Sequence, residues 1–196
     1  MAGEKPGLLL HLCCAPCVPY VVETLREEYE VTLYFYNPNI HPETEYMARL
    51  TEVRHLARLY RLPLVEDEYV SAKWFNAVKG LENEPERGAR CSVCFEKRLE
   101  KAAETAARMK LECFGTVLSV SPHKDAAVIN RIGAKTGETH DVSFLEADWK
   151  KKEGFKKTVE IGKNLGLHRQ DYCGCIFSLK SAIERKQNSS SHQNNG

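Results

Sequence analysis

Three cysteines stand within five residues in the stretch His11-Leu-Cys-Cys-Ala-Pro-Cys17, directly after the apolar run GLLL. Two more groups follow, Cys91-Ser-Val-Cys94 and Cys173-Gly-Cys175, so seven of the eight cysteines fall in three tight groups. In a reducing compartment such grouping is typical of metal binding or redox chemistry rather than of structural cross-linking. Cys113 stands alone inside a predicted strand, where we expect an ordinary buried thiol.

The first two groups share the C-x-x-C spacing at a predicted helix start, in Cys14-Ala-Pro-Cys17 and in Cys91-Ser-Val-Cys94. The N-terminus of a helix favours thiolate over thiol, and two such pairs can supply the four thiolates of a zinc site or an iron–sulfur cluster. The compact Cys173-Gly-Cys175 pair can close a strained, easily reduced disulfide or add further metal ligands. Spacing alone leaves three interpretations open: a cluster with a redox pair, a zinc site, and redox thiols without metal.

The composition is that of a globular protein. The 196 residues carry a formal net charge of +1, with 42% hydrophobic and 28% charged residues, so the chain is not a uniformly basic nucleic-acid binder. No apolar run reaches the ~20 residues of a membrane-spanning helix, and the run interrupted by His11 is too short for a signal peptide. We therefore expect a cytoplasmic protein that makes no contact with a membrane.

Apolar runs that predict strands alternate with amphipathic segments that predict helices. The predicted strands cover 7–12, 31–36, 62–68, 111–120 and 140–144, and the predicted helices cover 19–28, 44–60, 72–78, 91–109, 124–132 and 155–165. This alternation predicts an α/β fold with a mostly parallel sheet flanked by helices. We expect a single domain over 1–182 and a polar, disordered tail over 183–196.

Three unusual loops each follow a predicted strand. The loop from Cys13 to Cys17 follows the first predicted strand, and the loop from Asn37 to Pro42 follows the second. The segment from Ser119 to Lys124 follows the fourth predicted strand and overlaps its last two residues. Ligands of parallel sheets bind at the carboxyl ends of the strands. We therefore predict that these loops share one face of the domain and form the functional site.

Five motifs occur in order along the chain: HLCCAPC, NPNIHPETEY, RCSVCFEKRL, TVLSVSPHK and HRQDYCGCIFS. From about Leu8 to Ser178 they resemble the QueH-type epoxyqueuosine reductases. The resemblance implies an oxidoreductase of tRNA processing and queuosine biosynthesis, which reduces the epoxide of epoxyqueuosine at the wobble position to queuosine. It also implies a Rossmann-like sheet of the nucleotide α-hydrolase or PP-loop type. CCAPC replaces the SGGxDS phosphate loop of ATP-using relatives, so we expect no ATP-binding loop.

The resemblance also implies a [4Fe–4S] cluster, whose four ligands would be Cys13, Cys14, Cys91 and Cys94. Spacing alone favours Cys17 as the partner of Cys14, which leaves Cys17 as a reserve ligand or an active-site thiol. Residues on a strand point to alternate faces, so Cys13 and Cys14 can converge only if the strand ends before them. Cys173 and Cys175 are the implied redox-active pair. An additional iron beside the cluster is also implied, with the carboxylate candidates Asp148, Asp125 and Asp171.

Reduction of an epoxide to an alkene takes two electrons and two protons, and the leaving oxygen needs a proton donor or Lewis acid. His123 and His41 are the candidate general acids because histidine titrates near neutrality. The expected partners are a tRNA anticodon loop carrying epoxyqueuosine and an electron donor of unknown identity. Candidates for contacts to the RNA are Arg49, Arg98, Arg169 and the run Lys150–Lys152.

Two rival functions fit part of the pattern. A zinc-stabilised RNA-binding module without catalysis accounts for the C-x-x-C pairs, but it leaves Cys173 and Cys175 without a role. A thiol–disulfide oxidoreductase of the thioredoxin kind needs only one such motif. Anaerobic purification separates a brown iron–sulfur protein with labile sulfide from a colourless zinc protein.

Overall fold

The computed structural model describes residues 5–193 and contains one parallel sheet of five strands in the order β3-β2-β1-β4-β5. The strands are β1 Gly7–Leu12, β2 Glu30–Phe35, β3 Leu64–Glu66, β4 Cys113–Thr116 and β5 Ser143–Phe144. The α-helices are α1 Val18–Leu25, α2 Glu43–Tyr60, α3 Ser71–Ala77, α4 Ala89–Arg108, α5 Ala126–His140, α6 Gly154–Asn164 and α7 Ile176–Gln193. Short 3₁₀ helices are η1 Ala15–Cys17 and η2 Leu118–Val120. The predicted α/β class with a parallel sheet is confirmed. Within residues 5–193, the structure has no helix with the length and apolarity needed to cross a bilayer.

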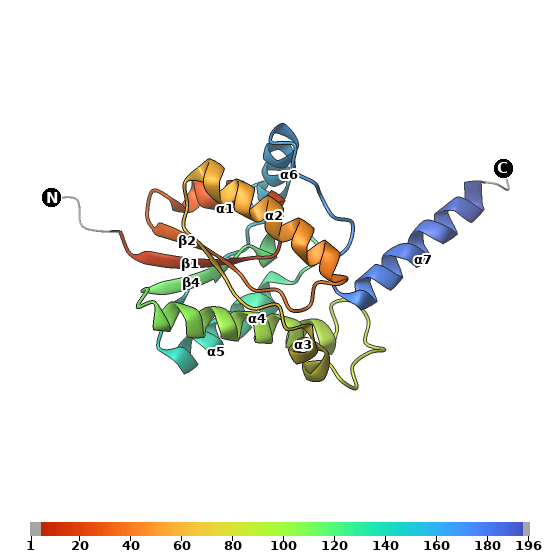
Figure 1. The fold of residues 1–196 in the computed structure, drawn as a ribbon, viewed down its shortest axis with the longest axis horizontal. Helices are drawn as coiled ribbons and strands as arrows, with labels where there is room; N and C mark the ends of the chain where they lie inside the picture. The colour runs from red at the N-terminus through yellow and green to blue at the C-terminus, as the bar shows by residue number, and fades with distance from the viewer. Residues whose placement is uncertain (1–4, 194–196) are drawn as a thin grey trace.

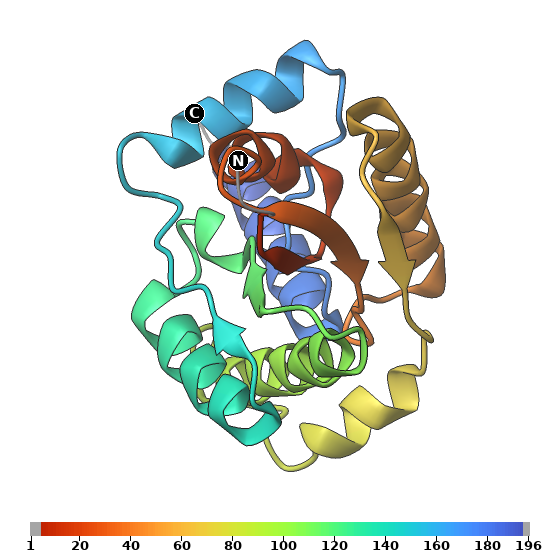
Figure 2. The same cartoon turned by 90° about the vertical axis from the view of Figure 1, so that its left-hand side faces the viewer.

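β1 lies at the centre of the sheet, and its side chains point alternately to the two faces. Leu8, Leu10 and Leu12 pack in the core beneath α1 and α2, whereas Leu9 packs in the core beneath α4 and α5. All four leucines are fully buried, and each such side chain contributes about 1.5–3 kcal/mol of hydrophobic stabilisation. Figures 1 and 2 show the two helical layers, with α1, α2 and α6 on one face and α4 and α5 on the other.

The strand order reverses next to β1, because the chain first adds β2 and β3 on one side and then β4 and β5 on the other. The segments that follow β1 and β4 therefore diverge, which creates the crevice where such sheets bind ligands. β1 ends at Leu12, so Cys13 and Cys14 lie beyond the strand and are free of its alternation. Cys13 and Cys14 can therefore point toward the same side, as a shared cluster would require.

Two elements, β4 and α5, differ most in length from their prediction. The strand predicted over 111–120 is β4 followed by η2, because Trp149 Nε1 donates to the carbonyl of Thr116 at 3.0 Å and ends the ladder. The helix predicted over 124–132 continues as α5 to His140. Its glycines allow close packing on β5, since a Cβ at Gly133 would lie 2.4 Å from Cζ of Phe144.

α7 occupies a region where the sequence predicts a loop and then a disordered tail from 183 onward. No proline or glycine stands between Ile176 and Gln193, so nothing in the covalent chain interrupts the helix once it begins. Figure 1 shows α7 projecting from the α/β body. Residues 194–196 of the predicted tail lie outside the described residues. The domain boundary at 182 and the disorder of the tail stay predictions.

Candidate functional site: a thiol-lined cavity

A cavity of about 840 Å³ opens at the carboxyl ends of the strands, between the segment after β1, the segment after β4 and the starts of α4 and α7. Seven of the eight cysteines line it: Cys13, Cys14, Cys17, Cys91, Cys94, Cys173 and Cys175. Asn39 and the run from Ser121 to Lys124 line it as well, so the predicted convergence of the unusual loops is confirmed. The eighth cysteine, Cys113, is buried in the core as expected.

The first cysteine group forms a chain of sulfur contacts. Cys13 Sγ lies 3.9 Å from Cys14 Sγ, and Cys14 Sγ lies 3.9 Å from Cys17 Sγ. Cys14 therefore lies next to Cys13, the second ligand that the family resemblance implies, and also next to Cys17, the second ligand that the spacing favours. The hydrogen bond to Cys14 and burial raise the pKa of Cys13. The hydrogen bond from Cys13 lowers the pKa of Cys14, but the hydrogen bond to Cys17 and burial outweigh it and raise that pKa to about 12.

The second group lies in the first two turns of α4. Cys91, Cys94 and Arg98 share one side of this helix, because their spacing of three and four residues is close to one helical turn. Burial raises the pKa of both thiols. Arg98 Nη2 donates to Asn37 Oδ1 at 2.7 Å, and Asn37 Nδ2 donates to the carbonyl of Leu12 at 2.9 Å. This network connects the helix that carries Cys94 to the end of β1.

The third group is held by a sharp turn and by the first turn of α7. Cys173 Sγ and Cys175 Sγ lie 3.6 Å apart. Gly174 between them has φ +113°, and a Cβ there would lie 2.9 Å from Ile40 Cγ1, so the turn requires glycine. Ser178 Oγ lies 3.0 Å from Cys173 Sγ and 3.4 Å from Cys175 Sγ.

The two thiols of this group differ in acidity. The hydrogen bond with Cys175 lowers the pKa of Cys173 well below its usual value, and the Ser178 hydroxyl adds to this effect against the opposing effect of burial. The same hydrogen bond, followed by burial, raises the pKa of Cys175. Cys173 is therefore the more acidic thiol of the pair, and Cys175 is the one that retains its proton.

The loop that carries this pair is anchored to α2 and to the segment after β2. Arg49 Nη1 donates to the carbonyl of Cys173 at 3.2 Å, and Arg49 Nε pairs with Glu45 at 2.7 Å. His41 N donates to the carbonyl of Gly174 at 2.7 Å. Arg49 and Arg98 are each only 2% exposed, which contradicts their prediction as contacts to an RNA backbone.

The structure separates the two histidines that the sequence proposes as acids. His123 is exposed and lies on the cavity lining. His41 lies in an aromatic cluster, with its ring centroid 4.6 Å from that of Phe75 and its Nδ1 2.8 Å from the carbonyl of Asn39. Only His123 is therefore positioned to reach a molecule in the cavity.

The carboxylate candidates are likewise divided. Asp148 is absent from the cavity lining, and its Oδ1 pairs with Lys150 Nζ at 3.0 Å. This ion pair accounts for Asp148 without an iron and differs from its predicted role. Asp125 and Asp171 do line the cavity, where Asp125 caps α5 through Ala127 N at 2.9 Å and Asp171 pairs with Lys186.

The predicted basic run also splits into two roles. Lys150 Nζ donates to the carbonyls of Ser119 at 3.1 Å and Lys124 at 3.2 Å, so it fixes the loop after β4. Lys151 and Lys152 are exposed, and Arg169 is exposed on the cavity lining with its guanidinium 4.7 Å from the Phe155 ring centroid.

The sequence reasoning does not assign a role to two cavity residues, Lys124 and Ser178. Burial lowers the pKa of Lys124, but the charges of Cys13 and Cys173, which line the same cavity, outweigh burial and raise it overall. The position of Lys124 after β4, at the strand end where ligands gather, was an available signal. For Ser178 the signal was a hydroxyl three residues after Cys175 at a helix start.

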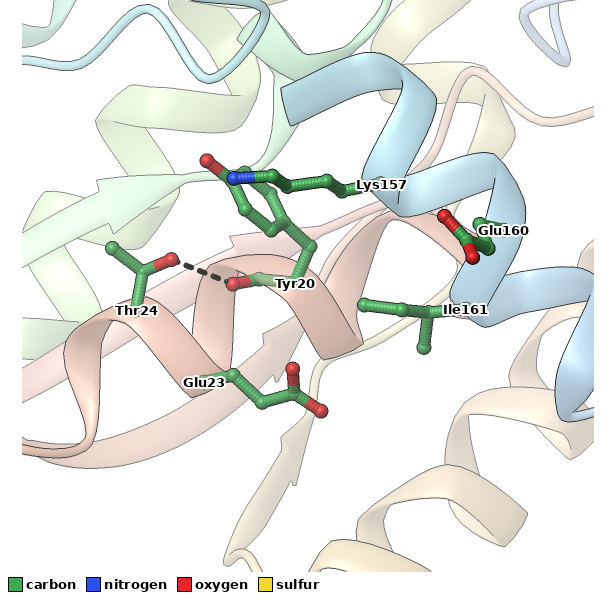
Figure 3. A pocket seen from close by; sticks show the side chains of 6 residues that line it. All are labelled: Tyr20, Glu23, Thr24, Lys157, Glu160 and Ile161. Carbon is green, nitrogen blue, oxygen red and sulfur yellow. Dashed lines mark hydrogen bonds between the residues drawn. The ribbon is translucent and has the colours of Figure 1, made fainter. Parts of the chain in front are cut away.

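A second pocket, of about 330 Å³, lies between α1 and α6 (Figure 3). Its lining residues are Tyr20, Glu23, Thr24, Lys157, Glu160 and Ile161. Thr24 Oγ1 donates to the Tyr20 carbonyl at 2.8 Å, and Lys157 Nζ lies 5.7 Å from the Tyr20 ring centroid. These contacts are those of two packed surface helices, so the chemistry belongs to the thiol-lined cavity.

Comparison with known proteins is consistent with this geometry. The family model described as epoxyqueuosine reductase QueH matches residues 8–181. The chain is 42% identical over 177 residues to Epoxyqueuosine reductase QueH of Haemophilus influenzae, covering 89% of this chain and 72% of that protein. It is 38% identical over 194 residues to the protein of the same name from Staphylococcus epidermidis, covering 94% and 82%. With the Thermotoga maritima protein the identity is 35% over 183 residues, covering 92% of each.

Solved structures share the fold at low sequence identity. The U34-tRNA thiolase NcsA from Methanococcus maripaludis, solved with its [4Fe-4S] cluster, gives a TM-score of 0.57 at 12% identity and covers 97% of this chain and 68% of that one. A protein described as a predicted subunit of tRNA methyltransferase from Methanocaldococcus jannaschii gives 0.54 at 9% identity, covering 80% and 74%. The predicted Rossmann-like fold is thereby confirmed.

Proposed function

This chain belongs to the epoxyqueuosine reductase QueH family, and from that premise we propose that it reduces the epoxide of epoxyqueuosine at the tRNA wobble position to the alkene of queuosine. The observation that carries the proposal is the gathering of seven cysteines in one cavity within the residues that the family model matches. The family match favours this enzyme over the zinc-stabilised module and the thioredoxin-like oxidoreductase. A cytoplasmic location remains part of the proposal.

The donor set fits a thiolate-bound iron–sulfur cluster, with Cys13, Cys14, Cys91 and Cys94 as its ligands. Within residues 5–193, no three His, Cys, Asp or Glu side chains are grouped for a single metal ion. Thiols that hold a cluster bind different irons and need not be grouped in that way. When bound, such a cluster supplies single electrons. For the additional iron, Asp125 and Asp171 have the support of their position on the cavity lining, which Asp148 lacks.

Cys173 and Cys175 suit the role of a two-electron donor. Their sulfurs lie 3.6 Å apart, and their unequal acidity provides one nucleophile and one proton source. Oxidation of a dithiol to a disulfide releases two electrons and two protons. The epoxide consumes both as its two C–O bonds break and the oxygen leaves as water. An external low-potential electron donor then reduces the disulfide and returns the pair to its starting state.

The cavity has room for a modified base beside the thiols. Its volume of about 840 Å³ lies within the range of small-molecule sites. Bases of an anticodon loop are only partly stacked, so one can be extruded into a pocket at modest cost. His123 lies on the lining and is the proposed proton donor to the leaving oxygen.

The decisive experiment is anaerobic incubation of the reconstituted protein with tRNA containing epoxyqueuosine and a low-potential reductant, followed by nucleoside analysis by mass spectrometry. We expect conversion to queuosine. Cys113→Ala serves as the matched cysteine control, because Cys113 lies in the core and not on the cavity lining. Absence of queuosine in the presence of a fully loaded cofactor would contradict the proposed activity.

A further inference from the structure

The lining of the cavity contains positive charges that no carboxylate neutralises. Arg90 and Arg98 are 4% and 2% exposed, and Lys124 is half-buried. In the part of the chain from residue 5 to 193, none of the three forms an ion pair with an aspartate or glutamate. Arg90 Nη1 donates to three backbone carbonyls at 2.5–3.1 Å, which satisfies that end of its side chain. Arg98 and Lys124 therefore remain to be explained.

The acidic residues of the cavity do not supply the missing charge. Glu86, Asp125 and Asp171 line the cavity but are all exposed. Asp125 is occupied as the cap of α5, and Asp171 pairs with Lys186. A buried cation without a counter-charge is strongly unfavourable, so the balancing negative charge must come from the thiols or from what they bind.

Arg98 lines the same cavity as Cys13 and Cys14, which follow β1, and as Cys91 and Cys94 of α4. Its positive charge acts to lower the pKa of both Cys13 and Cys94, against the larger opposing effect of their burial. Asn37 holds the guanidinium by Nη2 at 2.7 Å, while Nε is buried without a partner. The side chain is thus fixed by a neutral residue, and one of its donors is buried without a partner. Such an arrangement suits a negatively charged neighbour that the protein alone does not provide.

We propose that Arg98 and Lys124 are charge-compensating residues that make the interior of the cavity selective for anionic contents, and that they stabilise the negative charge of its thiolate-bound cofactor. The identity of that cofactor rests on the proposed function. Four thiolates around a doubly positive cluster core carry two units of negative charge, which these two cations match. Arg98 acts through the thiols and is a positioning residue.

The first test needs neither cofactor nor tRNA. The metal-free protein is alkylated at Cys91 and Cys94 with iodoacetate, an anion, and in parallel with neutral iodoacetamide, and the rates are measured by peptide mass spectrometry. Both reagents attack the thiolate, so their rate ratio cancels the thiolate fraction and reports the local potential. Arg98→Met should lower the iodoacetate-to-iodoacetamide ratio by about threefold or more, since one unit charge a few ångströms away is removed.

Arg108→Met is the matched control, because it removes the same charge from the exposed end of the same helix and should leave the ratio unchanged. Arg98→Lys should retain most of the ratio, which a merely structural role would not predict. If Arg98→Met does not fold, Lys124→Met provides the same measurement at Cys13. An unchanged ratio in a folded Arg98→Met protein, or an unchanged ratio in Lys124→Met where that variant replaces it, overturns the proposal.

A second readout uses the reconstituted protein. Loss of the Arg98 charge should disfavour reduction of the cofactor by about tenfold, which is a shift of about 59 mV to lower potential for a one-electron couple. The two proposals fail separately. A protein that makes no queuosine but loses anion selectivity in Arg98→Met contradicts only the proposed function. If the unchanged protein makes queuosine but the iodoacetate-to-iodoacetamide ratio stays the same in Arg98→Met, only this inference is contradicted.

Discussion

Six of the seven cysteines of the cavity, all except Cys17, form two groups that differ in how they are held. Cys13, Cys14, Cys91 and Cys94, the binding group, come from the end of a strand and the start of a long helix, where burial and sulfur contacts raise their pKa values. Cys173 and Cys175, the reactive pair, come from a loop in which one thiol has a lowered pKa. The first group, which we propose as cluster ligands, would give up its protons to a metal, whereas the second contains one thiol that is more acidic than its neighbour.

Loss of one thiol from the binding group should have the largest effect. In Cys94→Ser we expect bound iron and sulfide to fall by more than about tenfold, because one of four thiolates is gone. In Cys175→Ser both contents should equal those of the unchanged protein, although no queuosine is formed. Iron and sulfide analysis with visible absorption spectra measures the difference. Equal losses in the two variants would abolish the distinction between the groups.

The reactive pair should be distinguished by its pH profile. Hydrogen bonding from Cys175 lowers the pKa of Cys173, so Cys175→Ala should raise that pKa and slow alkylation of Cys173 near neutrality. The expected loss of rate is about tenfold per unit of pKa, and it should vanish at a pH above both values. Iodoacetamide rates at Cys173 from pH 5 to 10 test this. A profile that does not move would remove the evidence for unequal acidity.

Ser178→Ala should give a smaller change in the same direction. Ser178 is fully buried and its hydroxyl donates to the carbonyl of Cys175 at 2.9 Å. Its loss should cost about 1 kcal/mol in the free energy of unfolding and raise the pKa of Cys173. Ser178→Thr keeps the hydroxyl and should restore the alkylation profile. Denaturant titration measures the stability; if Ala and Thr behave alike, the hydroxyl has no such role.

The smallest effect should come from outside both groups. Lys151 is exposed beside the structural Lys150, so Lys151→Glu should weaken tRNA binding and reduce the slope of log affinity against log salt by about one, with the cofactor intact. Lys135→Glu, the same charge change on the exposed side of α5, is the control. Equal slopes for Lys151→Glu and Lys135→Glu would exclude Lys151 from the RNA interface.

Local patterns predicted the elements of this fold well. Apolar residues that recur with the period of a strand or of a helix show which side of a segment is buried, and this pattern can be recognised from neighbouring residues alone. β1, β2, α2 and α4 accordingly lie within two residues of their predicted ranges. β4 ended early because Trp149, distant in sequence, bonds to Thr116. α7 was missed because its polar composition carries no strong periodic signal.

The charged residues show where sequence reasoning stops. Arg49 and Arg98 read as surface cations, yet Arg49 holds the loop of Cys173 and Arg98 bonds to Asn37, 61 residues away in sequence. Asp148 read as a ligand, yet it pairs with Lys150 outside the cavity. The type of a side chain is written in the sequence, but its partner depends on which elements pack together.

The sequence by itself determined the kind of chemistry, because thiols in tight groups and alternating elements are properties of neighbouring residues. Only the tertiary structure decided which thiols meet, which of them gives up its proton first and which cations stay without a carboxylate. Those outcomes depend on distances and burial between segments that lie far apart in the chain, and electrostatic interactions are governed by such distances.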